Sequence, residues 1–550
     1  MSDPHALETY RLFDLALAVG EPEARLVDKA RARLGLAPEE LAGLRIARKA
    51  LDARWRNGAR RLEFVCHVDV VVRPGALRSA AAKRELAGGK LKRAPETGRT
   101  RVDGLDDAAR ARRALVVGSG PAGLFAAGLL AKNGLAVTLI ERGPPVEERS
   151  RPLVQFHRTR VVDPEANLLF GEGGAGTYSD GKIYTRVDDP LEVVLLDELV
   201  ACGAPPSIAY DSLAHIGTDR LHRILPTLRA RMRADGVRFL FRTRLEGLSL
   251  RGDGERAVVA ADTTAGPIEC EVCFLAVGHS ARDTWRTLHA QGVPFEAKPF
   301  QLGLRIEHPQ ELVDRARYGA ATRQLGAASY NLISKSDGAL PAAYSFCMCP
   351  GGRIVASVNE PGLLCTNGMS NSRHSSGWAT AALVTTFGSA EFGSQPFDGV
   401  RFQRELEARF FEAGGGDYTA PAQTAADFLA GRKGASVRHS TYPFGTVSAR
   451  LDELVPPVAR GALARALERF DRQLPGFASA DGLFVGLESR SSGPVRVPRD
   501  RQSRLARGFS NLYPLGEGAG YAGGIMSAAL DGANAALSYL DSLARPSAAR

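Results

Sequence analysis

A glycine-rich turn at residues 118–123 constrains the fold of this chain more than any other segment. The apolar run ALVV at 114–117 directly precedes Gly118, Gly120 and Gly123, and an apolar helical stretch follows them. In a strand–turn–helix unit, Gly118 permits the tight turn, Gly120 lets the backbone approach a pyrophosphate, and Gly123 lets the helix pack on the sheet. The sequence therefore predicts a βαβ dinucleotide-binding unit that starts near residue 112.

Four further residues of this unit are predicted to contact the cofactor. Pro121 and Ala122 open the helix, whose N-terminus carries free N–H groups and a partial positive charge that attract phosphate. Glu141 ends the next strand, where its carboxylate can accept hydrogen bonds from a ribose diol, and Arg142 follows it. NAD and FAD domains share this fingerprint, so the unit alone leaves the dinucleotide open.

A second glycine-rich segment, residues 171–182 (GEGGAGTYSDGK), has the same spacing but lacks a strand before it and a helix after it. We interpret it as a loop of small residues whose backbone passes close to a flat ring or a diphosphate, with a plain loop as the alternative. The predicted cofactor contacts in this loop are Gly173, Gly174, Thr177, Ser179, Asp180 and Lys182.

A third glycine-rich segment lies near the C-terminus. Residues 513–525 (YPLGEGAGYAGGI) predict the end of a strand, an acidic residue, glycines and a helix start. Glu517 can bond a ribityl hydroxyl, and a helix that begins near Gly524 can direct N–H groups at the pyrimidine end of a flavin. An NAD domain has no use for a second helix N-terminus there, so this segment favours FAD. The predicted contacts are Gly516, Glu517, Gly523, Gly524 and Ile525.

The length of 550 residues predicts several domains in an α/β architecture. A discontinuous, Rossmann-like FAD-binding domain is expected to carry an inserted mixed α+β domain and a small N-terminal α+β module. Within the module we expect helices over residues 23–44, and we read 214–236 as a polar stretch between a helix and strands. The predicted parts are the module (1–77), a basic linker (78–111), the first FAD-binding part (112–299), the inserted domain (300–510) and the closing segment (511–545).

Charge and composition exclude several classes of protein. Lys and Arg exceed Asp and Glu by 71 − 61 = 10, and more than half of this excess lies in residues 78–113. That segment indicates a solvated linker or flap, with an anionic-partner site as the alternative, and we predict no nucleic-acid binding. The longest apolar stretches contain Lys132 and Asp531, so no membrane span is expected. The acidic N-terminus and seven scattered cysteines favour the cytoplasm.

The glycine-rich segments, together with others, resemble one protein family. The chain is similar to the bacterial "uncharacterised FAD-dependent dehydrogenases", which are NAD(P)/FAD-dependent oxidoreductases with an FAD-dependent-protein C-terminal domain, within the two-dinucleotide-binding-domain flavoproteins. The resemblance spans about residues 40–540 and implies FAD at the contacts above and at Gly278. It implies little about the substrate. The segments that carry it include LLFGEGGAGTYSDGK (168–182), AVGHSARDTW (276–285), YSFCMCPGGRIVAS (344–357), GLESRSSGPVRV (486–497) and YPLGEGAGYAGGIMSAALDG (513–532).

Three side chains are candidate catalytic groups. Lys182 can contact a flavin carbonyl or an anionic substrate. His279 follows a predicted strand end and could act as an acid or base, with a hydrogen-bonding loop histidine as the alternative. Cys347 lies two residues before Cys349, which in a flat strand places both on one face about 5.5 to 7 Å apart, awkward for a mutual disulfide. Structural packing, a single reactive thiol near the flavin and metal binding stay open for this pair; no metal site is otherwise predicted.

We therefore predict an FAD-dependent oxidoreductase in which flavin N5 accepts or donates a hydride. No second βαβ unit is predicted, so NAD(P)H would be a transient donor, or the electrons would come from an organic substrate or a protein partner. The alternatives are a flavin-dependent monooxygenase and a flavin-binding protein with a structural, sensing or RNA-modification role. The sequence leaves the substrate undetermined.

Overall fold

A five-stranded parallel sheet organises the largest part of the chain, for which the computed structural model describes residues 7–56, 59–60 and 62–544. The strand order is β25-β13-β7-β8-β9. The late strand β25 pairs with β13, which in turn pairs with β7, so one sheet joins segments from residues 113–275 and 512–514 and the predicted discontinuous Rossmann-like domain is confirmed. The strands are β7 (Arg113–Val117), β8 (Ala136–Ile140), β9 (Arg238–Leu240), β13 (Val272–Leu275) and β25 (Leu512–Pro514).

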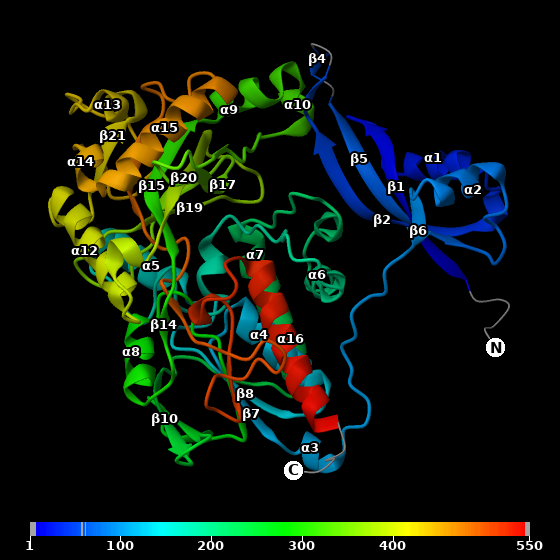
Figure 1. Cartoon of the computed structure of the whole chain (residues 1–550), viewed down its shortest axis with the longest axis horizontal. Coiled ribbons are helices and arrows are strands. Elements are labelled where there is room, and N and C mark those ends of the chain that lie inside the picture. The colour runs from blue at the N-terminus through cyan, green and yellow to red at the C-terminus, as the bar shows by residue number, and fades with distance from the viewer. Residues whose placement is uncertain (1–6, 57–58, 61, 545–550) are drawn as a thin grey trace.

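Two helices with small side chains cover one face of this sheet. Helix α4 (Pro121–Lys132) follows β7, and α16 (Ile525–Ala544) crosses it closely (Figure 1). The contact is close because Gly532 lies directly against the backbone of Ala122, where a Cβ atom would collide with the carbonyl oxygen. The end of the chain therefore completes the domain that begins near residue 112.

Helix α7 (Thr218–Ala234) corrects our reading of residues 214–236 as a polar stretch. The many arginines of this helix made the segment look polar. Its buried face is formed by Leu221, Ile224, Leu225 and Leu228, which recur at helical spacing and pack in the core of the parallel sheet. Helix α6 (Leu191–Ala201) adds four leucines to the same core. In the described residues no helix has the length and apolar character that a membrane crossing requires.

The N-terminal module is a four-stranded antiparallel sheet in the order β2-β5-β1-β6 with two helices on one face, which stands to one side of the molecule (Figure 1). Two of our expectations were wrong here. Within 23–44 the helical elements are α1 and a single 3₁₀ turn at Pro38–Glu40, because β2 starts at Leu41. The predicted linker begins too early, because α2 and β6 bury Ala82 and Leu91 in the core of the module. The elements are β1 (Glu8–Ala18), α1 (Arg25–Leu34), β2 (Leu41–Asp52), β5 (Glu63–Val72), α2 (Ala80–Ala87) and β6 (Leu91–Arg93).

A long extended segment, residues 94–106, runs from this module to α3 (Asp107–Arg110) at the bottom of the view, near the end of α16 (Figure 1). The module also contacts the FAD-binding part directly, because the Lys49 amide donates to the Tyr210 carbonyl (2.7 Å) and Arg48 donates to Ser212 (3.0 Å). The module is thus attached by hydrogen bonds as well as by the linker.

The inserted part is built on a seven-stranded sheet in the order β16-β17-β20-β15-β23-β21-β22. Helix α15 packs on it through residues with helical spacing, such as Ala459, Leu463 and Phe470, which are all fully buried. The strands are β15 (Phe300–Pro309), β16 (Ile333–Ser334), β17 (Ala343–Cys349), β20 (Trp378–Phe387), β21 (Ala420–Thr424), β22 (Thr446–Ser448) and β23 (Leu483–Glu488), and the helices are α9 (Gln310–Arg317), α10 (Thr322–Leu325), α11 (Ser389–Phe392), α12 (Asp398–Ala413), α13 (Ala425–Ala430), α14 (Leu451–Leu454) and α15 (Pro457–Gln473).

Residues 495–509 fall inside the predicted inserted domain but pack elsewhere. Val495, Val497 and Phe509 share a core with Leu115 and Cys273 of the parallel sheet. The chain has therefore already returned to the FAD-binding domain before residue 510.

The remaining elements are α5 (Ser150–Thr159), α8 (Arg282–Ala290), the sheet of β10 (Leu245–Arg251), β11 (Ala257–Thr263) and β12 (Ile268–Glu269), and the pairs β14 (Glu296–Ala297) with β24 (Val495–Arg496), β18 (Arg353–Ala356) with β19 (Thr366–Met369) and β3 (Trp55–Arg56) with β4 (Ala59–Arg60).

A buried carboxylate joins the two large parts. Glu407 of α12 is fully buried and accepts from Arg282 of α8 (2.9 and 3.0 Å) and from Arg490 after β23 (3.0 and 3.1 Å). Burial alone would raise the pKa of Glu407, but the two guanidiniums hold it below its usual range. The carboxylate therefore stays charged in the folded protein and fixes α8 against the inserted part.

We expect Glu407→Gln to lower the free energy of unfolding at pH 7 by about 3 to 5 kcal/mol, because it removes the buried carboxylate that both guanidiniums share and leaves Glu360 as the ion-pair partner of Arg282. Urea denaturation measures this change. Because the folded pKa of Glu407 lies below the unfolded one, its contribution is complete above about pH 4.5 and falls as acid protonates it, so the gap between wild type and variant shrinks at low pH.

Glu405→Gln is the matched control, since the Glu405 side chain on the same helix is 61% exposed. We expect it to change stability by less than about 0.5 kcal/mol. Equal effects of the two variants would contradict a special role for Glu407.

Candidate functional site

The glycine turn has the geometry that its sequence predicts. Gly118 adopts a φ of 103°, and a Cβ atom there would collide with the Ala276 carbonyl oxygen, while one at Gly123 would collide with the Gly118 carbonyl oxygen. At Gly120, by contrast, no atom lies within 4 Å of the place of a Cβ, and the helix that follows has no side-chain cap. The N-terminus of α4 thus faces open space with free N–H groups, as a pyrophosphate requires.

The other predicted cofactor segments meet around this turn. A Cβ at Gly174 would lie 3.2 Å from the Gly120 Cα, and one at Gly176 would lie 3.0 Å from the Ile525 side chain. Gly518 approaches Gly278 equally closely, with 2.6 Å from its Cβ position to the Gly278 nitrogen. The residues between 171 and 182, at 278 and between 516 and 525 therefore form one site with the α4 N-terminus, and its close backbone approaches fit a flat dinucleotide such as FAD.

Glu141 and Arg142 already have protein partners. The buried Glu141 carboxylate accepts from the amides of Ser119, Gly143 and Gly171 (2.9 Å each) and from the Ser119 hydroxyl (2.8 Å). It thereby ties the glycine turn to the 171–182 loop, and a ribose diol would have to replace one of these donors. Arg142 pairs with Glu165 and Asp283 and stacks on Phe170. Ribose binding by Glu141 and a cofactor contact by Arg142 stay predictions.

The small polar residues of the 171–182 loop hold the loop itself. The Thr177 hydroxyl donates to the Glu172 carbonyl (3.0 Å) and the Ser179 hydroxyl donates to the Gly176 carbonyl (2.8 Å). Gly173 and Gly174 both adopt positive φ values, and the short 3₁₀ turn Gly174–Tyr178 begins there. The structure thus assigns Thr177 and Ser179 to the shape of the loop, while their contact with a cofactor remains a prediction.

Asp180 and Lys182 connect this loop to the inserted part. The buried Asp180 carboxylate pairs with Lys182 Nζ (2.9 Å) and His215 Nε2 (3.2 Å) and accepts a hydrogen bond from the Ser370 hydroxyl. Burial would raise the pKa of Asp180, but Lys182 and His215 lower it, and Asp180 in turn raises the pKa of Lys182. Lys182 also donates to the Met348 carbonyl in β17. The Lys182 ammonium therefore contacts both halves of the site, the 171–182 loop and the inserted part.

Strand β17 is irregular at its cysteines, which corrects our expectation of a flat strand. The register shifts between Phe346 and Cys349, and Cys347 adopts a φ of 47°, a left-handed conformation that costs energy for a cysteine. As a result the Cys349 thiol turns back and donates to the Cys347 carbonyl (3.2 Å). Cys347 is partly exposed and Cys349 is buried, and within the described residues no metal-holding group of three or more side chains occurs.

The charges around Cys347 favour its thiolate. The Cys349 thiol, Lys182 and Arg305 together lower the pKa of Cys347 to about 6, although burial opposes the shift. Arg305 donates to the Cys347 carbonyl (3.0 Å) and to Cys349 Sγ (3.4 Å). His215 and Ser370 were not among the site residues that the sequence predicted. His215 and Ser370 lie in segments that share the family resemblance (HIGTDRL, 215–221, and TNGMSNSRHS, 366–375), but nothing in these segments predicts that both side chains meet Asp180.

Two carboxyl groups near the thiolate are held with raised pKa values. Glu488 is fully buried, and burial raises its pKa to about 7 in spite of its ion pair with Arg305 (3.1 Å). Its Oε1 lacks a hydrogen-bond partner within the described part of the chain. Burial also raises the pKa of Glu517 to about 8, against the opposing effect of Lys298. The charge of Cys347 contributes to the raised pKa of both carboxyls.

His279 lies at the edge of the site in a neutral form. Burial, Arg490 and Arg282 lower its pKa to about 4, and its Nδ1 bonds the Ser280 hydroxyl at 2.7 Å. This geometry suits a loop histidine that holds residues 277–280 in place. An acid–base role for His279 stays a prediction.

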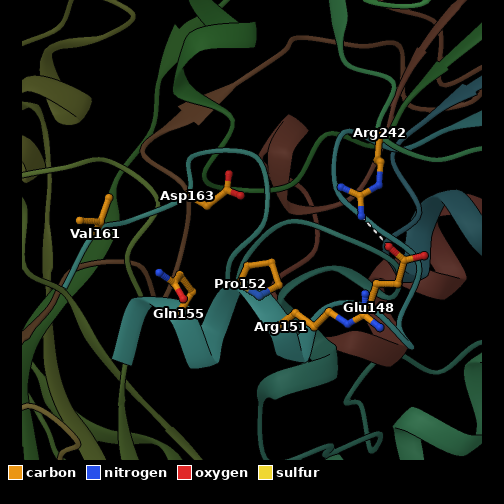
Figure 2. Close-up of a pocket in the computed structure, with 7 residues that line it drawn as sticks. All are labelled: Glu148, Arg151, Pro152, Gln155, Val161, Asp163 and Arg242. Carbon is orange, nitrogen blue, oxygen red and sulfur yellow. Dashed lines mark hydrogen bonds and ion pairs between the residues drawn. The ribbon is translucent and has the colours of Figure 1, made fainter. Parts of the chain in front are cut away.

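A separate cavity of about 370 Å³ lies beside α5 (Figure 2). Its wall includes Arg151, Pro152 and Gln155 from the helix and an ion pair between Glu148 and Arg242 (2.5 Å). None of its lining residues belongs to the predicted cofactor contacts, so we do not assign the cofactor to it.

Comparison with known proteins agrees with this geometry. Residues 112–162 match a family described as "FAD binding domain", and residues 299–491 match one described as "FAD-dependent protein, C-terminal domain-like". A protein of Clostridium beijerinckii, named "Uncharacterized protein", is 36% identical over 527 residues, which cover 95% of this chain and 97% of that one. The chain belongs to this family of FAD-dependent oxidoreductases. FAD is its cofactor, and the residues around Gly120 fit it.

Solved structures are only loosely similar. L-proline dehydrogenase from P. horikoshii is 11% identical with a TM-score of 0.32, over 78% of this chain and 92% of that chain. Glycine oxidase from Bacillus cereus is 12% identical with a TM-score of 0.30, over 80% of this chain and all of that chain. Scores this low say nothing about the substrate of this protein.

We expect Gly120→Val to weaken FAD binding at least tenfold, or by about 1.4 kcal/mol, because the new side chain would fill the space in front of the α4 N-terminus. The φ of −71° at Gly120 suits valine, so the unfolding midpoint of the FAD-free protein should stay unchanged. Binding is measured by titrating FAD-free protein and following flavin fluorescence.

Gly254→Val is the control, since Gly254 is exposed and also has open space around its Cβ position. We expect it to bind FAD like the wild type. Unchanged FAD affinity of Gly120→Val would place the pyrophosphate elsewhere.

Proposed function

We propose that this FAD-dependent oxidoreductase exchanges a hydride with its substrate through flavin N5, at the place where the 171–182 loop meets β17. The supporting observation is the position of Lys182, which is anchored by Asp180 in the cofactor loop and by Met348 in the inserted part. A substrate held by the inserted part would thus lie next to a flavin held by the glycine turn. When bound, FAD supplies the two-electron chemistry of the reaction.

The residues of the chain bind, orient and hold protons. The N-terminus of α4 would bind the pyrophosphate, and the N-terminus of α16, which starts at Ile525, would stabilise the negative charge of the reduced ring. Glu517, with its pKa raised to about 8, holds a proton on its carboxyl at neutral pH and can deliver it to a leaving or reduced group. Lys182 keeps its charge and can orient an anionic or carbonyl-bearing substrate.

The substrate that we propose is a small molecule or an electron-transfer partner, and NAD(P)H is a transient donor. Among the described strands only the β25-β13-β7-β8-β9 sheet has a βαβ unit of the dinucleotide-binding kind, so a nicotinamide would approach the flavin without a domain of its own. A cytoplasmic location is part of the proposal and is supported by seven cysteines that are all free thiols.

The proposal is tested by the visible spectrum of the purified protein under anaerobic conditions. We expect flavin absorbance near 450 nm (about the usual flavin maximum) that bleaches when NADH, NADPH or an organic donor is added and returns with an acceptor. Dithionite gives the fully reduced reference. Flavin that no donor other than dithionite can reduce would contradict the oxidoreductase proposal and would support a structural or sensing role.

A further inference from the structure

We propose that Cys347 and Cys349 form a thiol pair that exchanges two electrons with the FAD, and that the substrate is therefore a thiol or a disulfide. This inference rests on the proposed function, because the flavin must accept or supply the electrons. It gives that function a substrate class, which the sequence left undetermined.

The backbone of β17 brings the two sulfur-bearing residues together. In a flat strand, residues i and i+2 present parallel side chains, and the strand geometry opposes a bond between them. Here the bulge and the left-handed conformation of Cys347 bend the strand, and the Cys349 thiol reaches back to the Cys347 carbonyl (3.2 Å). A costly backbone conformation at a non-glycine residue persists where the surrounding structure enforces it, and such sites are often functional.

The two thiols are unequal in the way that an attacking and a resolving cysteine must be. Cys347 is partly exposed and has a lowered pKa, whereas Cys349 is fully buried and burial raises its pKa. A thiolate, not a thiol, attacks a disulfide, and an attacking thiol with a pKa near ambient pH reacts fastest. Cys347 is therefore the residue that meets the substrate, and Cys349 is the residue that closes the pair.

Two positively charged side chains, one from each large part of the protein, lie close to Cys347 and Cys349. Lys182 reaches it from the cofactor loop through the Met348 carbonyl, and Arg305 reaches it from β15 through the Cys347 carbonyl and Cys349 Sγ. The negative groups that face it are Asp180, Glu488 and Glu517, of which the two glutamates have raised pKa values. Protonated carboxyls do not oppose a thiolate, so the site favours charge on Cys347. Lys182 acts on Cys347 as a positioning residue.

The proposed step balances in atoms and electrons. The Cys347 thiolate attacks one sulfur of a substrate disulfide, forms a mixed disulfide and releases the other substrate sulfur as a thiolate, which takes a proton from Glu517. Cys349 then attacks the Cys347 sulfur and breaks the mixed disulfide, its proton passes to the departing second substrate sulfur, and a Cys347–Cys349 disulfide is left. Reduced FAD, when bound, would supply the two electrons that split this disulfide, and of the two protons one would return to Cys349 and one to Glu517, while Cys347 regains its thiolate. Run in reverse, the same pair oxidises a substrate dithiol and passes the electrons to FAD.

The electron capacity of the holoprotein tests this pair. We expect oxidised, FAD-loaded protein to take up about four electrons per FAD in an anaerobic dithionite titration, two for the flavin and two for the disulfide. Cys347→Ser and Cys349→Ser should each take up about two. The control Cys202→Ser changes a buried cysteine in the FAD-binding part, after α6, and should still take up about four.

Each result of this titration has a definite meaning. A capacity of about two electrons in the wild type, with a flavin that bleaches fully, overturns the thiol pair and leaves the proposed function intact. A flavin that cannot be reduced overturns both. A capacity of about four in the wild type and in Cys347→Ser also overturns the assignment, because another pair would then hold the extra electrons.

The pH dependence of alkylation tests the thiolate without using activity. We expect iodoacetamide to label Cys347 in the reduced protein with a midpoint near pH 6, read from the mass of its peptide. Lys182→Met should move this midpoint toward the ordinary thiol value of about 8.5, whereas the surface variant Lys335→Met should not. A wild-type midpoint near 8.5, or no shift in Lys182→Met, would overturn the proposed role of the lysine and the thiolate.

Discussion

The buried carboxylate of Glu407 is the interaction on which the relative position of the two large parts depends. It accepts hydrogen bonds from Arg282 of the FAD-binding domain and Arg490 of the inserted part, and all three side chains are almost fully buried. A charge in such a place is tolerated only when its partners are complete, so the pairing leaves little freedom for the two parts to separate. The loops that hold the cofactor are therefore held against the sheet that carries the cysteines.

This fixed arrangement explains why the ionisable groups of the site have unusual pKa values. At the junction of the two parts, Lys182 and Arg305 bring positive charge to Cys347. Desolvation keeps protons on Glu488 and Glu517, and the same cations remove one from Cys347, so that acids and a thiolate coexist near neutral pH. Groups with pKa values moved toward neutrality are typical of sites that transfer protons. The chemistry that we propose follows from this contrast.

Much of the cofactor-binding half could be predicted because its determinants are local. Gly118 and Gly123 are required by contacts with Ala276 and with the turn itself, and the surrounding strand and helix show the matching apolar pattern. Predictions failed where a local pattern was ambiguous. The many arginines of α7 made its sequence look polar although its leucines are buried. The basic charge of residues 78–93 indicated a linker, although α2 and β6 each bury a residue there. In these segments packing against distant residues decided the structure.

The sequence by itself determined the class of cofactor. Its three glycine-rich segments are a strand–helix turn, a loop of small residues and a second helix start. Because glycine has no side chain, the backbone of each segment can come close to a dinucleotide. Only the tertiary structure decided which residues share the reactive site. Lys182 and Met348 are 166 positions apart, and the bulge that turns Cys349 toward Cys347 depends on the pairing of β17 with β20. Charge, burial and backbone strain depend on neighbours in space, and no spacing along the chain encodes them.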